Sequence, residues 1–171
     1  GYLPILIEAL PEGTMVRRGV PMAQVVNTDP ACYWLTSYIE TALLRAIWYP
    51  STVASNSRKV KQIIQPILEK TCDDPAAVLP FRLHDFGARG TTSFEQAGIG
   101  GAAHLVNFMG TDTMSAVLYA RRYYGAEMAG FSIPASEHST MTSWGQEHEA
   151  EAYGNMIDKF GGKGLYAVVS D

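Results

Sequence analysis

The chain has 171 residues, of which 47% are hydrophobic and 18% are charged, and its formal net charge is -4. This length fits one domain of ordinary size, and the composition allows a buried core and argues against disorder. The negative charge argues against a nucleic-acid partner, because protein surfaces that bind nucleic acids are strongly basic. It is compatible with a local basic pocket for a small phosphate ligand.

Residues 2–28 carry β-branched residues between glycines and prolines, a pattern typical of short antiparallel strands. The tetrapeptide NTDP then predicts a turn and a helix start, with Asp29 as the N-cap and Pro30 at the first helical position. Apolar residues recur at intervals of three and four through residues 31–49, which predicts a helix that Pro50 ends.

A second amphipathic helix is predicted over residues 55–71, and Pro66 either kinks or splits it. Residues 72–80 are predicted to form a loop. The chain is therefore divided into a β-rich segment, a helical segment and a third segment in which strands and helices alternate. Their ranges are 1–28, 29–79 and 80–171.

The third segment reads as four strands with helices between them. The predicted strands are FRLHDF, NFMG, GFSIPAS and LYAVVSD, and the helices begin at TSFEQ, DTMSA and STMTS. A capping-box pattern from Thr92 to Glu95 opens the first helix, Gly125 closes the second, and the third is predicted to run long and unbroken from Ser139. This alternation indicates a parallel α/β unit.

Polar and ionisable residues gather where these strands end. In parallel α/β folds the chemistry lies at the carboxyl ends of the strands. The residues at the four ends are His84, Asp85, Phe86 and Arg89; Gly110, Thr111 and Asp112; Ser136, Glu137 and His138; and Ser170 and Asp171. Any one of them alone is best explained as a helix cap or a surface charge, but the repetition favours a functional site.

The two cysteines, Cys32 and Cys72, form no C-x-x-C pair and have no histidine at metal-ligand spacing. We interpret them as reduced thiols of a cytoplasmic protein and expect no metal site built from this chain alone. No apolar run is long enough to span a membrane, so no membrane partner is expected. The chain opens at Gly1 and stops directly after a predicted strand, which leads us to expect a piece of a longer protein.

The motifs HDFGARG, AGIGGAAHLVNFMGTDT and SIPASEHSTMTSWG resemble the nicotinamide phosphoribosyltransferase family. GYLPILIEALPEG and NTDPACYWLTSYIET resemble the segments that precede the catalytic barrel of that family, and the resemblance runs in order over essentially the whole chain. It implies a pentosyltransferase of NAD salvage that makes nicotinamide mononucleotide and pyrophosphate from nicotinamide and phosphoribosyl pyrophosphate.

The resemblance also implies the fold and the partners. The expected fold is the first half of an irregular α/β barrel of the type II phosphoribosyltransferase kind, preceded by a small β-rich segment and helices. Members are homodimers with shared active sites at the dimer interface. They bind Mg²⁺ together with pyrophosphate and use ATP as an activating co-substrate.

Four residues are expected to contact substrate or to lie next to it. Phe86 offers a ring that can stack on the pyridine, although a core phenylalanine is the simpler interpretation of the residue alone. Arg89 offers a fork of donors for phosphate oxygens, and Arg82 ranks behind it. Asp112 is implied to accept a hydrogen bond from the amide of nicotinamide and to repel nicotinate; it is also well placed to cap the following helix.

His138 is implied to be phosphorylated by ATP, with Glu137 orienting it, although a helix-capping role is the simpler interpretation of the residue alone. His84 and Asp85 are implied to support the residues that contact the ligand. By resemblance only, a narrow tunnel beside the ring pocket is assigned to Ser132, Ile133 and Ala135. The remaining histidines, His104 and His148, are expected to be packing or surface residues.

Three other interpretations remain open at this point. A nicotinate phosphoribosyltransferase is the nearest, and the identity of the residue after the Gly-Thr pair, Asp112, argues against it. A fragment without activity that acts as a binding or assembly module is the second. A metal hydrolase is the most distant, because the His and Asp residues form no tight ligand motif.

Overall fold

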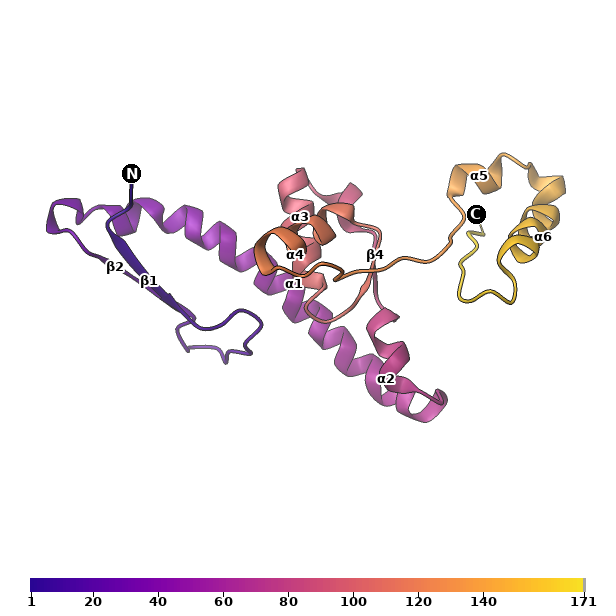
Figure 1. Cartoon of the computed structure of the whole chain (residues 1–171), viewed down its shortest axis with the longest axis horizontal. Coiled ribbons are helices and arrows are strands. Elements are labelled where there is room, and N and C mark those ends of the chain that lie inside the picture. The colour runs from indigo at the N-terminus through magenta and orange to yellow at the C-terminus, as the bar shows by residue number, and fades with distance from the viewer. Residues whose placement is uncertain (171) are drawn as a thin grey trace. The chain divides into compact units, whose positions relative to one another are not determined.

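The structure is a computed structural model that describes residues 1–170, so Asp171, at the end of the last predicted strand, lies outside the described residues. The chain has mixed α/β structure and forms two compact units, Gly1–Gly130 and the residues from Phe131 onward (Figure 1). Each unit is described by itself. The division into three segments made from the sequence stays a prediction.

The first unit opens with a β-hairpin, which confirms the antiparallel strands predicted within residues 2–28. Strands β1 (Ile5–Ala9) and β2 (Ala23–Asn27) pair antiparallel, with Ile5 opposite Asn27. Glycines with positive φ, Gly13 and Gly19, lie in the connection between the strands, where backbone of this kind favours a residue without a side chain.

A single helix, α1 (Leu35–Thr71), follows a short 3₁₀ turn (Pro30–Cys32) that Asp29 caps as predicted. The prediction that Pro50 ends a helix is wrong, and Pro66 does not split one either, because both prolines lie inside α1. A proline removes one backbone hydrogen bond from a helix, a loss that packing on either side of it can offset. Tyr49 and Val53, on either side of Pro50, line one wall of a cavity that is also lined by residues of helix α3 (Phe94–His104).

The segment predicted as a loop, residues 72–80, contains a short helix, α2 (Pro75–Val78), and leads into a 3₁₀ turn (Leu79–Phe81). Asp74 caps α2 by accepting a hydrogen bond from the Ala77 backbone N–H, at 3.0 Å. An aspartate followed by a proline is a helix-start signal, and it explains why this stretch is helical.

The alternation expected after residue 80 is confirmed in the first unit, with short strands. Strands β3 (His84–Asp85) and β4 (Gly110–Thr111) pair in parallel, with α3 (Phe94–His104) between them in sequence and α4 (Met114–Tyr124) after them. Helix α3 packs on both α1 and α4 (Figure 1). The glycines of α3 allow this approach: a Cβ on Gly101 would lie 2.4 Å from that of Ala116.

The ends of the two helices are set by local hydrogen bonds. The N-cap of α3 is Ser93 rather than Thr92, because the Ser93 hydroxyl accepts from the Gln96 N–H at 3.0 Å. The cap is therefore one residue later than predicted, and the Gln96 side chain accepts from the N–H of Thr92, the residue before the cap, at 2.8 Å. Gly125 closes α4 with φ +66°, as predicted.

The second unit contains α5 (His138–Thr142) and α6 (Glu149–Phe160), joined through a 3₁₀ turn (Gln146–His148). The single long helix predicted from Ser139 is therefore wrong: the chain turns at Gly145, whose φ is +82°. The predicted strands on either side are reduced to isolated bridges, among them a parallel one between Ala135 and Ala167. Within residues 1–170, no helix is both long and apolar enough to cross a bilayer.

Candidate active site

The ends of β3 and β4 bring together residues that are far apart in the sequence. The Asp112 N–H donates to the Asp85 carbonyl at 2.9 Å, which extends the parallel pairing by one step. The His84 Nε2 lies 2.9 Å from the Asp112 Oδ1. Helix α4 begins two residues later, and its N-cap residue is Thr113, so Asp112 lies just before the helix.

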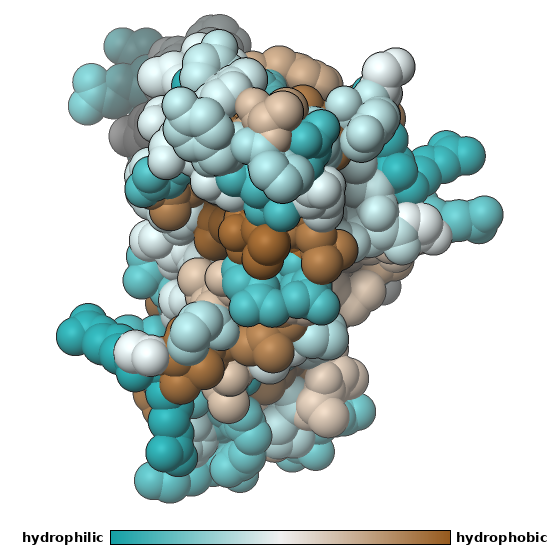
Figure 2. Space-filling model, turned by 90° about the vertical axis from the view of Figure 1, so that its left-hand side faces the viewer, coloured by the Kyte–Doolittle hydropathy of each residue, from teal (hydrophilic) through white to brown (hydrophobic). Residues whose placement is uncertain are grey.

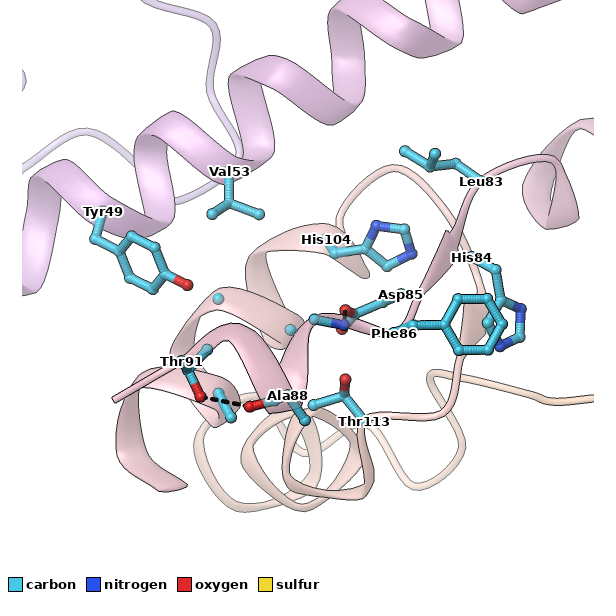
Figure 3. A pocket seen from close by; sticks show the side chains of 14 residues that line it. Tyr49, Val53, Leu83, His84, Asp85, Phe86, Ala88, Thr91, His104 and Thr113 are labelled. Carbon is cyan, nitrogen blue, oxygen red and sulfur yellow. Dashed lines mark hydrogen bonds between the residues drawn. The ribbon is translucent and has the colours of Figure 1, made fainter. Parts of the chain in front are cut away.

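Phe86 lies beside this pair and has a largely exposed ring. Its side chain is 61% exposed, and its ring centroid lies 4.5 Å from that of His84 at an interplanar angle of 32°. Figure 3 shows the two rings next to each other at the end of β3. An exposed aromatic ring beside a carboxylate and an imidazole fits a flat, polar ligand better than a core packing role.

Asp85 fastens the turn that follows Phe86. Its Oδ1 accepts from the Gly87 N–H at 2.7 Å, and its Oδ2 lies 3.4 Å from the Thr111 hydroxyl. This turn is a 3₁₀ segment, Gly87–Gly90, and it carries Arg89 as an exposed side chain. Arg82, before β3, is exposed as well. The structure therefore brings His84, Asp85, Phe86 and Asp112 together and leaves both arginines at the surface.

A cavity of about 360 Å³ lies next to this group. Tyr49 and Val53 of α1 form one wall, and Asp85, Ala88 and Thr113 lie opposite them (Figure 3). The Thr113 hydroxyl is buried and has no hydrogen-bond partner among residues 1–170, so the cavity wall offers an unused polar group.

A second hollow of about 510 Å³ is lined by Asp112, Ser93 and Ser115. It shares Ala88, Thr91 and Ala97 with the first. Tyr49 and Thr113 line the first cavity and were not predicted from the sequence. No local pattern marks either residue, because each is brought there by the packing of one helix or strand on another.

The buried His104 of α3 is hydrogen-bonded to the first residue of β4. It is 5% exposed, and its Nε2 lies 2.9 Å from the carbonyl oxygen of Gly110, which can only accept. Burial lowers the pKa of His104, with a smaller contribution from His84, while the Gly110 hydrogen bond and Asp85 oppose the change. A neutral imidazole that donates from Nε2 follows, and the expectation that His104 is a packing residue is confirmed.

The remaining predicted site residues lie in the second unit. His138 is the first residue of α5 and is exposed, and the Glu137 carboxylate caps this helix by accepting from the Ser139 N–H at 2.8 Å. The three residues assigned to a tunnel precede them: Ser132, Ile133 and Ala135. Within residues 1–170, no group of three or more His, Cys, Asp or Glu side chains could hold a metal ion.

Residues 81–168 match the model of the Nicotinate phosphoribosyltransferase (NAPRTase) family. The chain belongs to this family. The matched region contains β3, β4 and the residues to which a role toward substrate or ATP is assigned, whereas Ser170 and Asp171 lie beyond it.

Several curated relatives bear the name nicotinamide phosphoribosyltransferase. The protein from Xanthomonas campestris pv. campestris (strain 8004) is 55% identical over the whole of this chain and 36% of its own length. The protein from Acinetobacter baylyi is 39% identical over the whole chain and 34% of its own length. The protein from Mycoplasma genitalium is 33% identical over 85% of this chain and 30% of its own length. The chain thus spans about a third of the length of these relatives.

Proposed function

We propose that the chain forms part of an enzyme that transfers the phosphoribosyl group of phosphoribosyl pyrophosphate to nicotinamide, giving nicotinamide mononucleotide and pyrophosphate in NAD salvage. The observation that carries the proposal is the group at the ends of β3 and β4. There an exposed ring, Phe86, and a carboxylate, Asp112, both contact the imidazole of His84. Relatives named nicotinamide phosphoribosyltransferase that match the whole chain support it.

The reaction makes one bond and breaks one. The pyridine nitrogen attacks the anomeric carbon of the ribose while the bond from that carbon to pyrophosphate breaks, and pyrophosphate leaves with the electron pair. The nitrogen lone pair is free, so no base is needed to activate it. The protein must therefore position the ring and stabilise the charges on the phosphates.

Four residues of the first unit are given a direct role toward substrate in this proposal. Phe86 stacks on the pyridine, and Asp112 accepts a hydrogen bond from the amide NH₂ of nicotinamide. Arg89 binds phosphate oxygens, with Arg82 as a second cation. Ser132, Ile133 and Ala135 of the second unit are assigned to substrate binding by resemblance.

The nearest alternative is transfer to nicotinate, since the family description names that substrate. Asp112 argues against it. A carboxylate beside the ring repels the carboxylate of nicotinate and attracts the amide NH₂ of nicotinamide, so the charge of this one residue separates the two substrates.

The fold, the oligomer and the compartment are further parts of the proposal. The parallel pair β3–β4 supports an irregular α/β barrel, of which this chain would supply a part. Exposed apolar residues on α1 and the hairpin, among them Leu44, Trp48 and Val26, support a homodimer with shared active sites. Figure 2 shows such apolar surface interrupting the hydrophilic surface on one face. Both cysteines are free, which agrees with a cytoplasmic location.

Mg²⁺ is expected to enter with the substrate, because this ion is usually held by substrate phosphate oxygens together with one or two carboxylates. We propose that it is bound with the pyrophosphate group of phosphoribosyl pyrophosphate, where it neutralises charge on the leaving group.

ATP is assigned to His138, whose exposed imidazole would accept a phosphoryl group. Replacing His138 by Ala is expected to abolish the stimulation of the reaction by ATP and to leave the rate without ATP within about threefold of normal, because only the nucleophile is lost. The measurement is the rate of mononucleotide formation with and without ATP. Stimulation that persists in the variant would contradict this role.

The proposed reaction is tested by supplying nicotinamide, phosphoribosyl pyrophosphate and Mg²⁺ to the active protein that contains this chain. Nicotinamide mononucleotide and pyrophosphate should form in equal amounts, as measured by chromatography and phosphorus NMR. A correctly folded protein that forms neither product would favour the alternative of a binding or assembly module.

A further inference from the structure

We infer that His84 is a positioning residue for the amide-binding carboxylate: it holds Asp112 in place through one hydrogen bond and sets its position relative to the Phe86 ring. The inference rests on the proposed function and goes beyond it, because it assigns the selection of the substrate to a residue that does not itself need to touch the amide.

The hydrogen bond has a defined direction. The His84 Nε2 lies 2.9 Å from the Asp112 Oδ1, and an ionised carboxylate can only accept, so the imidazole carries its proton on Nε2. The side chain of His84 is 21% exposed and that of Asp112 is 42% exposed. The partly buried imidazole is thus the fixed member of the pair, and the carboxylate extends from it toward solvent.

The same imidazole also lies against Phe86, with ring centroids 4.5 Å apart. One side chain therefore contacts both the ring on which the pyridine is proposed to stack and the carboxylate proposed to bind its amide. The spacing between these two groups must match the spacing between the ring and the amide of nicotinamide. His84 fixes this spacing, and a loosely held carboxylate would lose affinity through the entropy of ordering it.

The backbone around His84 is shaped to hold the imidazole. A Cβ on Gly110, the residue paired with His84 in the parallel ladder, would lie 2.8 Å from the His84 Nδ1. Glycine at this position therefore makes room for the ring. The carbonyl of Gly110 is held from the other side by buried His104 at 2.9 Å. The imidazole is therefore held in one position by its surroundings, as a positioning residue requires.

The imidazole also makes the two contacts proposed for nicotinamide itself, a ring contact with Phe86 and a hydrogen bond to Asp112. If it occupied the place of the substrate, it would compete with nicotinamide instead of assisting it. The two roles predict opposite changes in the KM for nicotinamide when His84 is shortened.

Gln and Asn at position 84 form a matched pair for this test, because Gln can place an N–H where the His Nε2 lies and Asn is too short to do so. In the active protein, His84→Asn is expected to raise the KM for nicotinamide about tenfold and to relax the preference for nicotinamide over nicotinate. His84→Gln should stay within about threefold of the unmodified protein, and the KM for phosphoribosyl pyrophosphate should not change in either variant. The control is His148→Asn, at an exposed histidine bound only locally to Glu151.

A KM for nicotinamide that is unchanged or lower in His84→Asn would overturn the inference, and a lower value would show competition by the imidazole. Equal losses in the Gln and Asn variants would overturn it too, as would unfolding of both variants in a thermal melt, which would make His84 a folding residue. An unmodified protein that forms no mononucleotide would overturn the proposed function and this inference with it; normal activity with an unaffected His84→Asn would overturn this inference alone.

Discussion

Replacing Asp112 by Ser is expected to lower kcat/KM for nicotinamide by about 10- to 100-fold, the range for losing a hydrogen bond to a charged group. The Ser side chain is too short to reach the amide and carries no charge. The change also removes the Asp112 Oδ1, which lies 2.9 Å from the His84 Nε2 and accepts its hydrogen bond. The same change should raise the relative use of nicotinate, because the repelling carboxylate is gone.

The measurement is steady-state kinetics with each of the two substrates in the active protein. Asp73→Ser is a matched control, since Asp73 is an exposed aspartate that lies after α1 and outside both cavities. It should change neither value by more than about twofold. An Asp112→Ser protein with an unchanged ratio of nicotinamide to nicotinate use would contradict the role given to this carboxylate.

Replacing Phe108 by Ala is expected to lower the free energy of unfolding by about 3–5 kcal/mol, the usual cost of deleting a buried aromatic side chain. Phe108 is 0% exposed and stacks on His104, with ring centroids 5.7 Å apart. The Lys61 Nζ lies 5.8 Å from its ring centroid on the side of α1. Phe108 therefore joins α1, α3 and the start of β4, and the cavity left by its loss would loosen all three.

Urea or thermal denaturation followed by circular dichroism measures this loss. Phe94→Ala is the matched control, because Phe94 is 64% exposed, and it should cost less than about 1 kcal/mol. The packing described for the first unit would be wrong if the Phe108 and Phe94 variants were equally stable.

The sequence alone predicts which residues of the first unit lie together at the ends of β3 and β4. The rule that chemistry lies at the carboxyl ends of parallel strands selects His84, Asp85, Phe86 and Asp112, and the structure places these residues together. The rule works because it depends only on strand order, which the alternation of strands and helices reveals. The roles of these residues toward a substrate stay predictions.

Features set by tertiary packing are not visible in the sequence. Pro50 reads as a helix end, but α1 continues through it and packs against α3, where Tyr49 fits over Gly100: a Cβ there would lie 2.4 Å from the tyrosine hydroxyl. The local cost of the proline is clear from the sequence, whereas the compensating contact joins Tyr49 to Gly100, which lies 51 positions further along the chain. For the same reason Tyr49 and Thr113 were missed as cavity residues.

Local signals also compete with one another. Thr92 and Ser93 both suit an N-cap. In the structure Ser93 is the cap, because its hydroxyl accepts from the Gln96 N–H, and the Gln96 side chain in turn accepts from the Thr92 N–H. Gly145 reads as a tolerated helix glycine, but its positive φ breaks the predicted long helix into α5 and α6. A choice of this kind depends on which backbone conformation the surrounding packing favours.

The central claim, that the group at the ends of β3 and β4 selects the amide substrate for phosphoribosyl transfer, is tested most directly by a competition reaction. The active protein that contains this chain is given equal concentrations of nicotinamide and nicotinate with phosphoribosyl pyrophosphate and Mg²⁺, and the two mononucleotide products are separated and quantified. Their ratio equals the ratio of the two kcat/KM values. We expect nicotinamide mononucleotide to exceed nicotinate mononucleotide by at least about 100-fold, because the Asp112 carboxylate attracts the amide of one substrate and repels the carboxylate of the other. Equal amounts, or an excess of nicotinate mononucleotide, would contradict the account.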